Sequence, residues 1–171
     1  MIERKSLYKG RLDFGLEVAD LPNGERVALE IVRHPGGSVI AAIDDDGRVC
    51  MIRQYRHAVG DWIWELPAGV LDNNEAPLKA AKRELLEETG VKATRWQSLG
   101  PIWSTPGFTD EKLHLYSAKE LTLGESQPEQ GECIEVHWVP LEDLAVQCLN
   151  GEITDGKTII GLLRAHAAIK S

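Results

Sequence analysis

Cysteine and long apolar runs are both scarce in this chain, and each shortage excludes a class of protein. The cysteines Cys50, Cys133 and Cys148 are odd in number and form no Cys-x-x-Cys pair, so neither a disulfide framework nor a zinc knuckle is supported. No apolar run reaches the roughly 18 residues that cross a bilayer, and residues 1–10 lack the apolar core of a signal peptide. We therefore expect a cytoplasmic protein that does not contact membranes.

Basic residues are also in the minority. The 171 residues include 19 Lys and Arg against 27 Asp and Glu, a net charge of −8 at pH 7. A surface of this sign repels nucleic-acid backbones, so we expect no nucleic-acid partner, whereas a small anionic substrate is compatible with it if a metal neutralises the charge. The chain also lacks the GxSxG, GxxxxGK[ST], GxGxxG and HExxH motifs, which leaves serine-nucleophile and ATP-driven chemistry without residues.

The composition, 43% hydrophobic and 27% charged, is that of a globular protein of one domain's size. Turn signals separate short apolar stretches, a pattern that predicts strands joined in hairpins. We expect strands at Arg26–Val32, Val39–Ile43, Val49–Gln54, Trp96–Trp103, Leu113–Ala118 and Ile134–Val139.

Longer amphipathic segments predict helices at Leu78–Thr89, Leu141–Leu149 and Lys157–Ile169. Asn73 and Asn74 precede the first of them and favour helix N-caps, while Gly90 follows it and favours a C-cap. Helices placed between strands in this way predict an α/β fold, a sandwich built on a mixed sheet.

Glu84, Glu87 and Glu88 are spaced by three and four residues, which places their carboxylates on one face of the first predicted helix. Like charges there repel by roughly 0.2–0.5 kcal/mol per pair. A hard divalent cation would offset this repulsion, because Mg²⁺ takes oxygen ligands and leaves positions for water and substrate phosphates. The alternative is a solvated acidic face, with Lys79 and Lys82 nearby.

The residues around this helix form a longer pattern, G-x5-E-x7-R-E-U-x-E-E-x-G-U, in which U is a bulky aliphatic residue. Its defining positions are Gly69, Glu75, Arg83, Glu84, Leu85, Glu87, Glu88, Gly90 and Val91. The pattern resembles the Nudix box, with every defining position present. The resemblance implies the Nudix fold, an α/β/α sandwich around a mixed sheet, and hydrolysis of a nucleoside diphosphate linked to another group.

The same resemblance implies a metal site. Glu84 and Glu88 match the principal metal ligands, and Glu87 matches a third acidic residue that contributes a ligand or a base. Ala68 lies where the family offers a backbone carbonyl to the metal. The implied cofactor is Mg²⁺, with Mn²⁺ as the other candidate.

The remaining box residues match structural roles. Gly69 is expected to make the entry turn, and Glu75 and Gly90 complete the motif. Arg83 should orient the glutamates by hydrogen bonds, which agrees with the ability of a planar guanidinium to bridge two carboxylates.

The flanks of the box look like the ADP-ribose pyrophosphatase group of this family. The stretches that carry the likeness are His34-Pro-Gly-Gly, Gln54-Tyr-Arg, Trp64-Glu-Leu-Pro-Ala-Gly and Thr105-Pro-Gly-Phe-Thr-Asp-Glu, in which Pro106 occupies the position of the group's usual marker. The likeness implies hydrolysis of ADP-ribose or a related nucleoside diphosphate sugar to AMP and a sugar phosphate. It also implies a homodimer, with antiparallel β-strands in residues 1–36 for dimerisation and substrate contact, ahead of a Nudix domain at residues 37–171.

Eight positions match substrate contacts of this group: Arg33, Arg56, Glu65, Val70, Thr105, Pro106, Gly107 and Glu111. Arginine suits phosphate because it stays charged and binds in a bidentate way. The sequence leaves alternatives open for the charged positions. Arg33 could be a solvated strand end, Glu65 could pair with a basic neighbour, and Glu111 could cap a loop.

The segment Gly131-Glu-Cys-Ile-Glu-Val resembles the loop that brings a further catalytic glutamate to the metal in this group. That residue maps best to Glu132, with Glu129 as the substitute, and we expect it to serve as base and metal ligand. Two alternatives to the whole interpretation stay open. The chain could be a Nudix hydrolase of dinucleoside polyphosphates, GDP-sugars or oxidised nucleotides, or a non-catalytic module that senses ADP-ribose.

Overall fold

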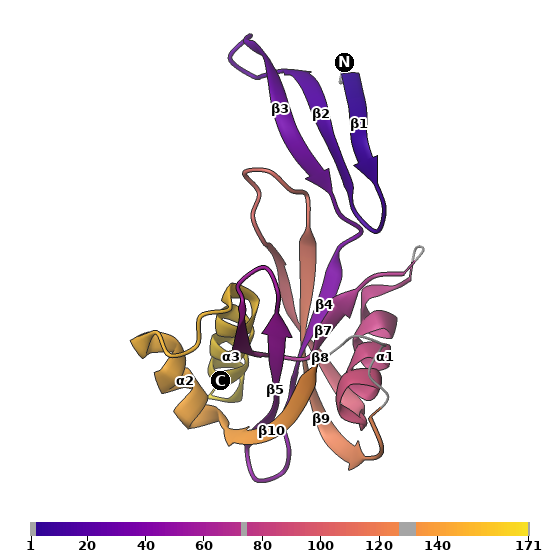
Figure 1. Cartoon of the computed structure of the whole chain (residues 1–171). Coiled ribbons are helices and arrows are strands. Elements are labelled where there is room, and N and C mark those ends of the chain that lie inside the picture. Colours follow the sequence, from indigo (N-terminus) through magenta and orange to yellow (C-terminus); the bar gives the residue numbers. More distant parts are fainter. Residues whose placement is uncertain (1–2, 73–74, 127–132, 171) are drawn as a thin grey trace.

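The computed structural model describes residues 3–72, 75–126 and 133–170 (Figure 1). Its strands are β1 (Glu3–Lys9), β2 (Asp13–Asp20), β3 (Arg26–Arg33), β4 (Gly37–Ala42), β5 (Arg48–Arg56), β6 (Asp61–Glu65), β7 (Ala68–Val70), β8 (Val91–Trp103), β9 (Lys112–Leu123) and β10 (Ile134–Pro140), and its helices are α1 (Pro77–Thr89), α2 (Leu141–Asn150) and α3 (Gly156–Ile169). Every strand and helix that the sequence predicts is present, several of them longer than expected. Within these residues, no helix combines the length and apolar character that a membrane crossing requires.

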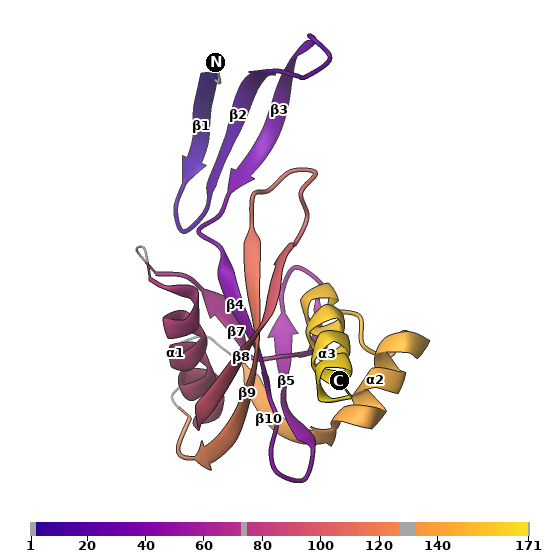
Figure 2. The ribbon, with the colours of Figure 1, turned by 180° about the vertical axis from the view of Figure 1, so that it is seen from behind.

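The body of the fold is an α/β/α sandwich, as predicted. A mixed sheet in the order β7-β4-β9-β8 runs through it, with β4 parallel to β9 and the other neighbours antiparallel. Helix α1 covers one face of this sheet, and α3, backed by α2, covers the other (Figures 1 and 2). A second sheet, β10-β5-β6, completes the body.

Strand β4 is buried on both faces. Val39 and Ala41 pack in one apolar cluster with Leu162 of α3, whereas Ile40 and Ala42 pack in a second cluster with residues of α1. Successive strand residues point to opposite faces of a sheet, so a strand between two helical layers needs an unbroken apolar run. Strand β4 pairs with β7 and packs against α1. It therefore sets the position of α1 relative to β7, and the candidate site lies between these two elements.

Helix α1 begins at Pro77 and its N-cap is Ala76 rather than Asn73 or Asn74, which lie outside the described residues. A residue before proline avoids the α region, and Ala76 is accordingly extended (φ −66°, ψ 135°). Pro77 suits the first helical position because its missing N–H would have no partner there. At the other end Gly90 adopts the left-handed conformation (φ 71°), which confirms the predicted C-cap.

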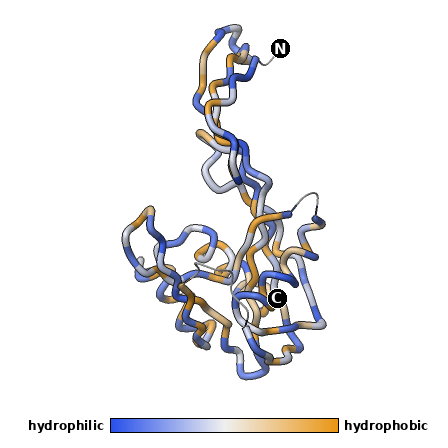
Figure 3. The backbone as a smooth tube through the Cα atoms, turned by 45° about the vertical axis from the view of Figure 1, so that its right-hand side comes forward, coloured by the Kyte–Doolittle hydropathy of each residue, from blue (hydrophilic) through white to orange (hydrophobic). Residues whose placement is uncertain are grey.

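Strands β1, β2 and β3 form a separate antiparallel sheet that extends away from the body (Figure 1). We call residues 3–33 the N-terminal arm. Figure 3 shows it as a narrow extension along which hydrophobic and hydrophilic residues are interspersed. Its large apolar side chains Leu7, Tyr8 and Leu29 are exposed.

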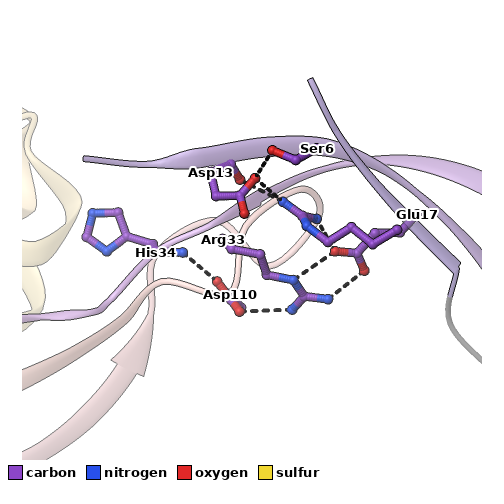
Figure 4. Close-up of polar contacts among 7 residues, drawn as sticks. Ser6, Asp13, Glu17, Arg33, His34 and Asp110 are labelled. Atoms are coloured by element: carbon purple, nitrogen blue, oxygen red, sulfur yellow. Dashed lines mark hydrogen bonds and ion pairs between the residues drawn. The ribbon is translucent and has the colours of Figure 1, made fainter. Parts of the chain in front are cut away.

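An ion-pair network joins the arm to the body (Figure 4). Arg33, at the end of β3, donates to the two carboxylate oxygens of Glu17 at 2.8 and 2.5 Å and to Asp110 at 2.9 Å. Asp110 also accepts the backbone N–H of His34 at 2.9 Å, and Arg4 pairs with Oε1 of Glu17, the oxygen that also accepts from Nε of Arg33. The hydrogen bonds from Arg33 lower the pKa of Glu17 although burial opposes the change. The network therefore sets the arm against the β8–β9 connection, where Asp110 lies.

Candidate active site

The acidic face of α1 turns toward β7. Glu88 is only 3% exposed, and its Oε2 accepts a hydrogen bond from the backbone N–H of Ala68 at 2.9 Å. The Glu84 side chain is largely buried, while Glu87 is about one-third exposed. Two of the three glutamates thus face the interior, which argues against a wholly solvated acidic face.

The backbone of β7 approaches Glu84 so closely that only glycine fits at position 69. A Cβ added to Gly69 would lie 1.9 Å from Cδ of Glu84. Any side chain there would displace the carboxylate from its place beside the strand. We call the space shared by Gly69, the Glu84 carboxylate and the neighbouring Glu88 the carboxylate cradle.

Arg83 connects the glutamates to the loop that precedes α1. Its guanidinium donates to Glu84 at 2.6 Å, to Glu87 at 3.0 Å and to Glu75 at 3.0 Å, and it reaches the carbonyl of Val70 at 3.2 Å. Burial would lower the pKa of Arg83, but these carboxylates raise it overall. Arg83 is thus fully charged and holds two box glutamates and the entry loop in one arrangement.

The chemistry of the cradle fits a divalent cation. Its carboxylate oxygens are ligands that Mg²⁺ and Mn²⁺ prefer, and the absence of a side chain at Gly69 lets the Glu84 carboxylate lie against β7. No set of three acidic, histidine or cysteine side chains is gathered as a ligand cluster in the part of the chain that the structure describes. There, Arg83 and the Ala68 N–H hold the carboxylates.

A cleft of about 570 Å³ opens beside the cradle, within the roughly 300–1,000 Å³ typical of small-molecule sites. It is formed by β5, β7, α1, the β8–β9 connection and the start of α3, so segments far apart in the sequence meet in it. The predicted site residues that line it are Arg56, Ala68, Gly69, Val70, Glu84, Thr105 and Glu111.

Glu65 pairs with basic neighbours, one of the two alternatives that the sequence leaves open. Its buried carboxylate, 1% exposed, accepts hydrogen bonds from Arg56 at 2.6 and 2.7 Å and from Lys157 at 2.5 Å. Burial alone would raise the pKa of Glu65, but the bonds from Arg56 and the charge of Lys157 lower it overall. Glu65 is therefore ionised and lies behind two cations.

Other predicted positions are described but do not line the cleft: Arg33, Glu65, Glu87, Glu88, Pro106 and Gly107. The guanidinium of Arg33 is engaged by Glu17 and Asp110 at the base of the arm, so it is neither a solvated strand end nor a cleft residue here. Glu132 and its substitute Glu129 lie outside the described residues.

The cleft also contains residues that sequence reasoning missed. Arg11, from the β1–β2 connection, Trp103, at the end of β8, and Asp155 and Lys157, at the start of α3, all line it. A signal for the start of α3 was present in the segment Asp155-Gly-Lys-Thr, because aspartate is a favoured N-cap residue of helices. Asp155 does cap α3, accepting the N–H of Thr158.

Residues 32–160 match the family model of the NUDIX domain. The chain belongs to the Nudix family. The predicted Nudix fold is thereby confirmed, and the matched range contains the glutamates of the carboxylate cradle.

Individual Nudix relatives are similar over nearly the whole chain. A protein of Mycobacterium tuberculosis (strain ATCC 25618 / H37Rv) named ADP-ribose pyrophosphatase is 40% identical over 97% of this chain and 82% of its own length. A protein of the same name from Bacillus subtilis (strain 168) is 37% identical over 92% of this chain and 86% of its own. A crystal structure of an ADP compounds hydrolase superposes with a TM-score of 0.83 at 20% identity, covering 99% of this chain and 94% of that one. At that identity it supports the fold alone.

Proposed function

We propose that the protein hydrolyses the pyrophosphate bond of ADP-ribose, or of a related nucleoside diphosphate sugar, to AMP and a sugar phosphate. The observation that carries this proposal is one cleft lined by both the Glu84 carboxylate and the Arg56 guanidinium. Metal-assisted attack on a diphosphate needs carboxylates to hold the metal and a cation to hold phosphate. The two relatives named ADP-ribose pyrophosphatase support the choice of substrate.

The proposed metal ligands are Glu84, Glu87, Glu88 and the carbonyl of Ala68, with Mg²⁺ as the ion and Mn²⁺ as the other candidate. Such an ion, when bound, stabilises charge on the reacting phosphate and lowers the pKa of a water toward neutrality. Arg83 keeps the ligands in place through its bonds to Glu84 and Glu87.

Other residues of the chain bind the substrate and handle the proton. Arg56 is placed to hold a phosphate oxygen, and Val70, Thr105 and Glu111 form the cleft around the rest of the molecule. We assign to Glu132, with Glu129 as the substitute, the role of orienting or deprotonating the attacking water. Arg33 is a further proposed substrate contact: its guanidinium pairs with Glu17 and Asp110 at the base of the arm, and its side chain is 41% exposed.

A substrate panel tests the proposal. We expect release of nucleotide product to require Mg²⁺ and to be fastest with ADP-ribose among ADP-ribose, ADP-glucose, GDP-mannose, diadenosine polyphosphate and 8-oxo-dGTP. A preference for another member would retain the metal site and contradict the substrate. Inactivity on all five would contradict the proposed hydrolysis and favour the sensing module.

We also propose that the protein is a cytoplasmic homodimer in which residues 1–36 contribute to the interface and to substrate contact, ahead of a catalytic unit at residues 37–171. The exposed apolar side chains of the arm, Leu7, Tyr8 and Leu29, support this role. The free thiols of Cys50, Cys133 and Cys148 agree with a reducing compartment. Light scattering should give twice the mass of the chain, and a monomer at micromolar concentration would refute the dimer.

A further inference from the structure

Two cations that line the cleft, Arg56 and Lys157, are built around one buried carboxylate. Glu65 lies on β6, facing away from solvent, and both of its hydrogen-bond partners are basic residues that line the cleft. One partner, Arg56, comes from the neighbouring strand β5, and the other, Lys157, comes from α3, 92 residues away along the chain. A buried carboxylate that holds two cations at a cleft fixes where both positive charges stand.

Among the described residues, Lys157 has acceptors for two of its three hydrogen-bond donors. Its Nζ lies 2.5 Å from Glu65 and 2.9 Å from Asp155. An ammonium has three N–H donors, so these two acceptors leave one. The side chain is 16% exposed at the cleft, and the remaining donor is therefore available to a ligand bound there.

Arg56 also has hydrogen-bond donors that Glu65 does not occupy. Its Nε and Nη2 donate to Glu65, while a guanidinium carries five N–H donors in a planar fork. The side chain is 41% exposed, so part of the fork is available to a ligand in the cleft. Since Arg56 and Lys157 share one acceptor, their remaining donors lie close enough to act on one anionic group.

The carboxylates that balance these cations are occupied by other bonds. Glu65 lies behind them at 1% exposure. Asp155 accepts from Lys157 and also from the N–H and hydroxyl of Thr158. Arg56 and Lys157 therefore keep donors for a ligand in the cleft that Glu84 also lines. A diphosphate bound in this cleft would have its negative charge neutralised by the two fixed cations and by a metal ion held at the carboxylate cradle.

We propose that Lys157 contacts a phosphate oxygen of the nucleoside diphosphate alongside Arg56, and that Glu65 is the positioning residue that holds both cations. The inference rests on the proposed function, since it names a substrate-binding residue of that site. Two of the three N–H donors of Lys157 are bonded to Glu65 and Asp155, and the third faces the ligand. The two bonds orient an otherwise flexible lysine toward the phosphate.

The test compares Lys157→Met, which keeps the length of the side chain and loses its charge, with Lys157→Arg, which keeps the charge. For Lys157→Met we expect the KM for ADP-ribose to rise about tenfold to a hundredfold, the range that one hydrogen bond to a charged group gives, with a smaller change in kcat. Lys157→Arg should recover most of the lost affinity. The fold should survive in both variants, because Glu65 keeps its two bonds to Arg56.

Lys92→Met is the matched control, because Lys92 is an exposed residue of β8 that does not line the cleft. Its KM should equal that of the wild type. Glu65→Gln should raise KM, and its melting temperature is measured in parallel. If Glu65 had only a structural role, this variant would have a lower melting temperature and an unchanged KM for the folded fraction. Unchanged KM in Lys157→Met, with an active wild type, would overturn the inference and leave the proposed function standing.

A second measurement distinguishes failure of this inference from failure of the proposed function. Calorimetry with inorganic pyrophosphate and Mg²⁺ measures the anion site without turnover. If the wild type fails to hydrolyse ADP-ribose, the proposed function falls, and the role of Lys157 is then decided by pyrophosphate affinity. A tenfold weaker affinity in Lys157→Met supports the subsite, whereas equal affinity, or no binding by the wild type, overturns it.

Discussion

Glu88→Gln is expected to lower kcat on the order of a hundredfold or more while the protein stays folded. A metal contributes several kcal/mol of charge stabilisation in the transition state, and about 1.4 kcal/mol corresponds to a factor of ten in rate. Glutamine removes the ligand charge but keeps a carbonyl oxygen that can still accept the Ala68 N–H, which Glu88 accepts at 2.9 Å. Steady-state kinetics at several Mg²⁺ concentrations, with circular dichroism as the check on folding, measures both effects.

Glu142→Gln provides the comparison for this variant, since Glu142 is an exposed carboxylate on α2, on the far side of the body from α1. It should retain full activity. A Glu88→Gln protein that turns over at the rate of the wild type would remove Glu88 from the proposed metal site.

Arg83→Ala should weaken metal binding without removing a ligand. Arg83 holds Glu84 and Glu87 and joins them to Glu75, and its loss leaves these carboxylates to repel one another. Residues that orient metal ligands typically contribute about tenfold to a hundredfold in metal affinity. We expect the Mg²⁺ concentration for half-maximal activity to rise by a factor in that range, with kcat partly restored at saturating metal.

Arg83→Lys distinguishes orientation from charge alone. Lysine keeps the positive charge but lacks the planar fork that reaches three carboxylates at once. An intermediate shift in the Mg²⁺ dependence is the expected result. If Arg83→Ala and the wild type have the same Mg²⁺ dependence, Arg83 does not orient the ligands.

The body of the fold is predictable from the sequence because its signals are local. The apolar run of β4 and the helical spacing of α1 each depend on neighbours within a few residues. The start of α1 was placed less well. The asparagines favour caps in isolation, but the proline at position 77 prevents the residue before it from being helical, and so the helix begins at Pro77 with Ala76 as its cap.

Local sequence signals likewise predict one part of the candidate site and miss another. The helical period alone places Glu84 and Glu88 on one face, and the structure turns that face toward β7. The pairing of Glu65 with Lys157 spans 92 residues, and that of Arg33 with Asp110 spans 77. No local pattern contains such partners, so the sequence could state the pairing of Glu65 only as an alternative. It did not predict Lys157 as a site residue.

The bond pattern around Glu65 also constrains how this protein can diverge. Lys157 can be replaced while Arg56 still satisfies the buried carboxylate, but replacing Glu65 first would leave two cations facing each other without their shared acceptor. Removing the shared acceptor of two cations is destabilising, and solvent in the cleft offsets only part of this, because Arg56 is 41% and Lys157 16% exposed. The order of substitution in evolution is therefore constrained, and we expect lineages to lose Lys157 before Glu65. Homologues that lack Glu65 should lack both cations as well.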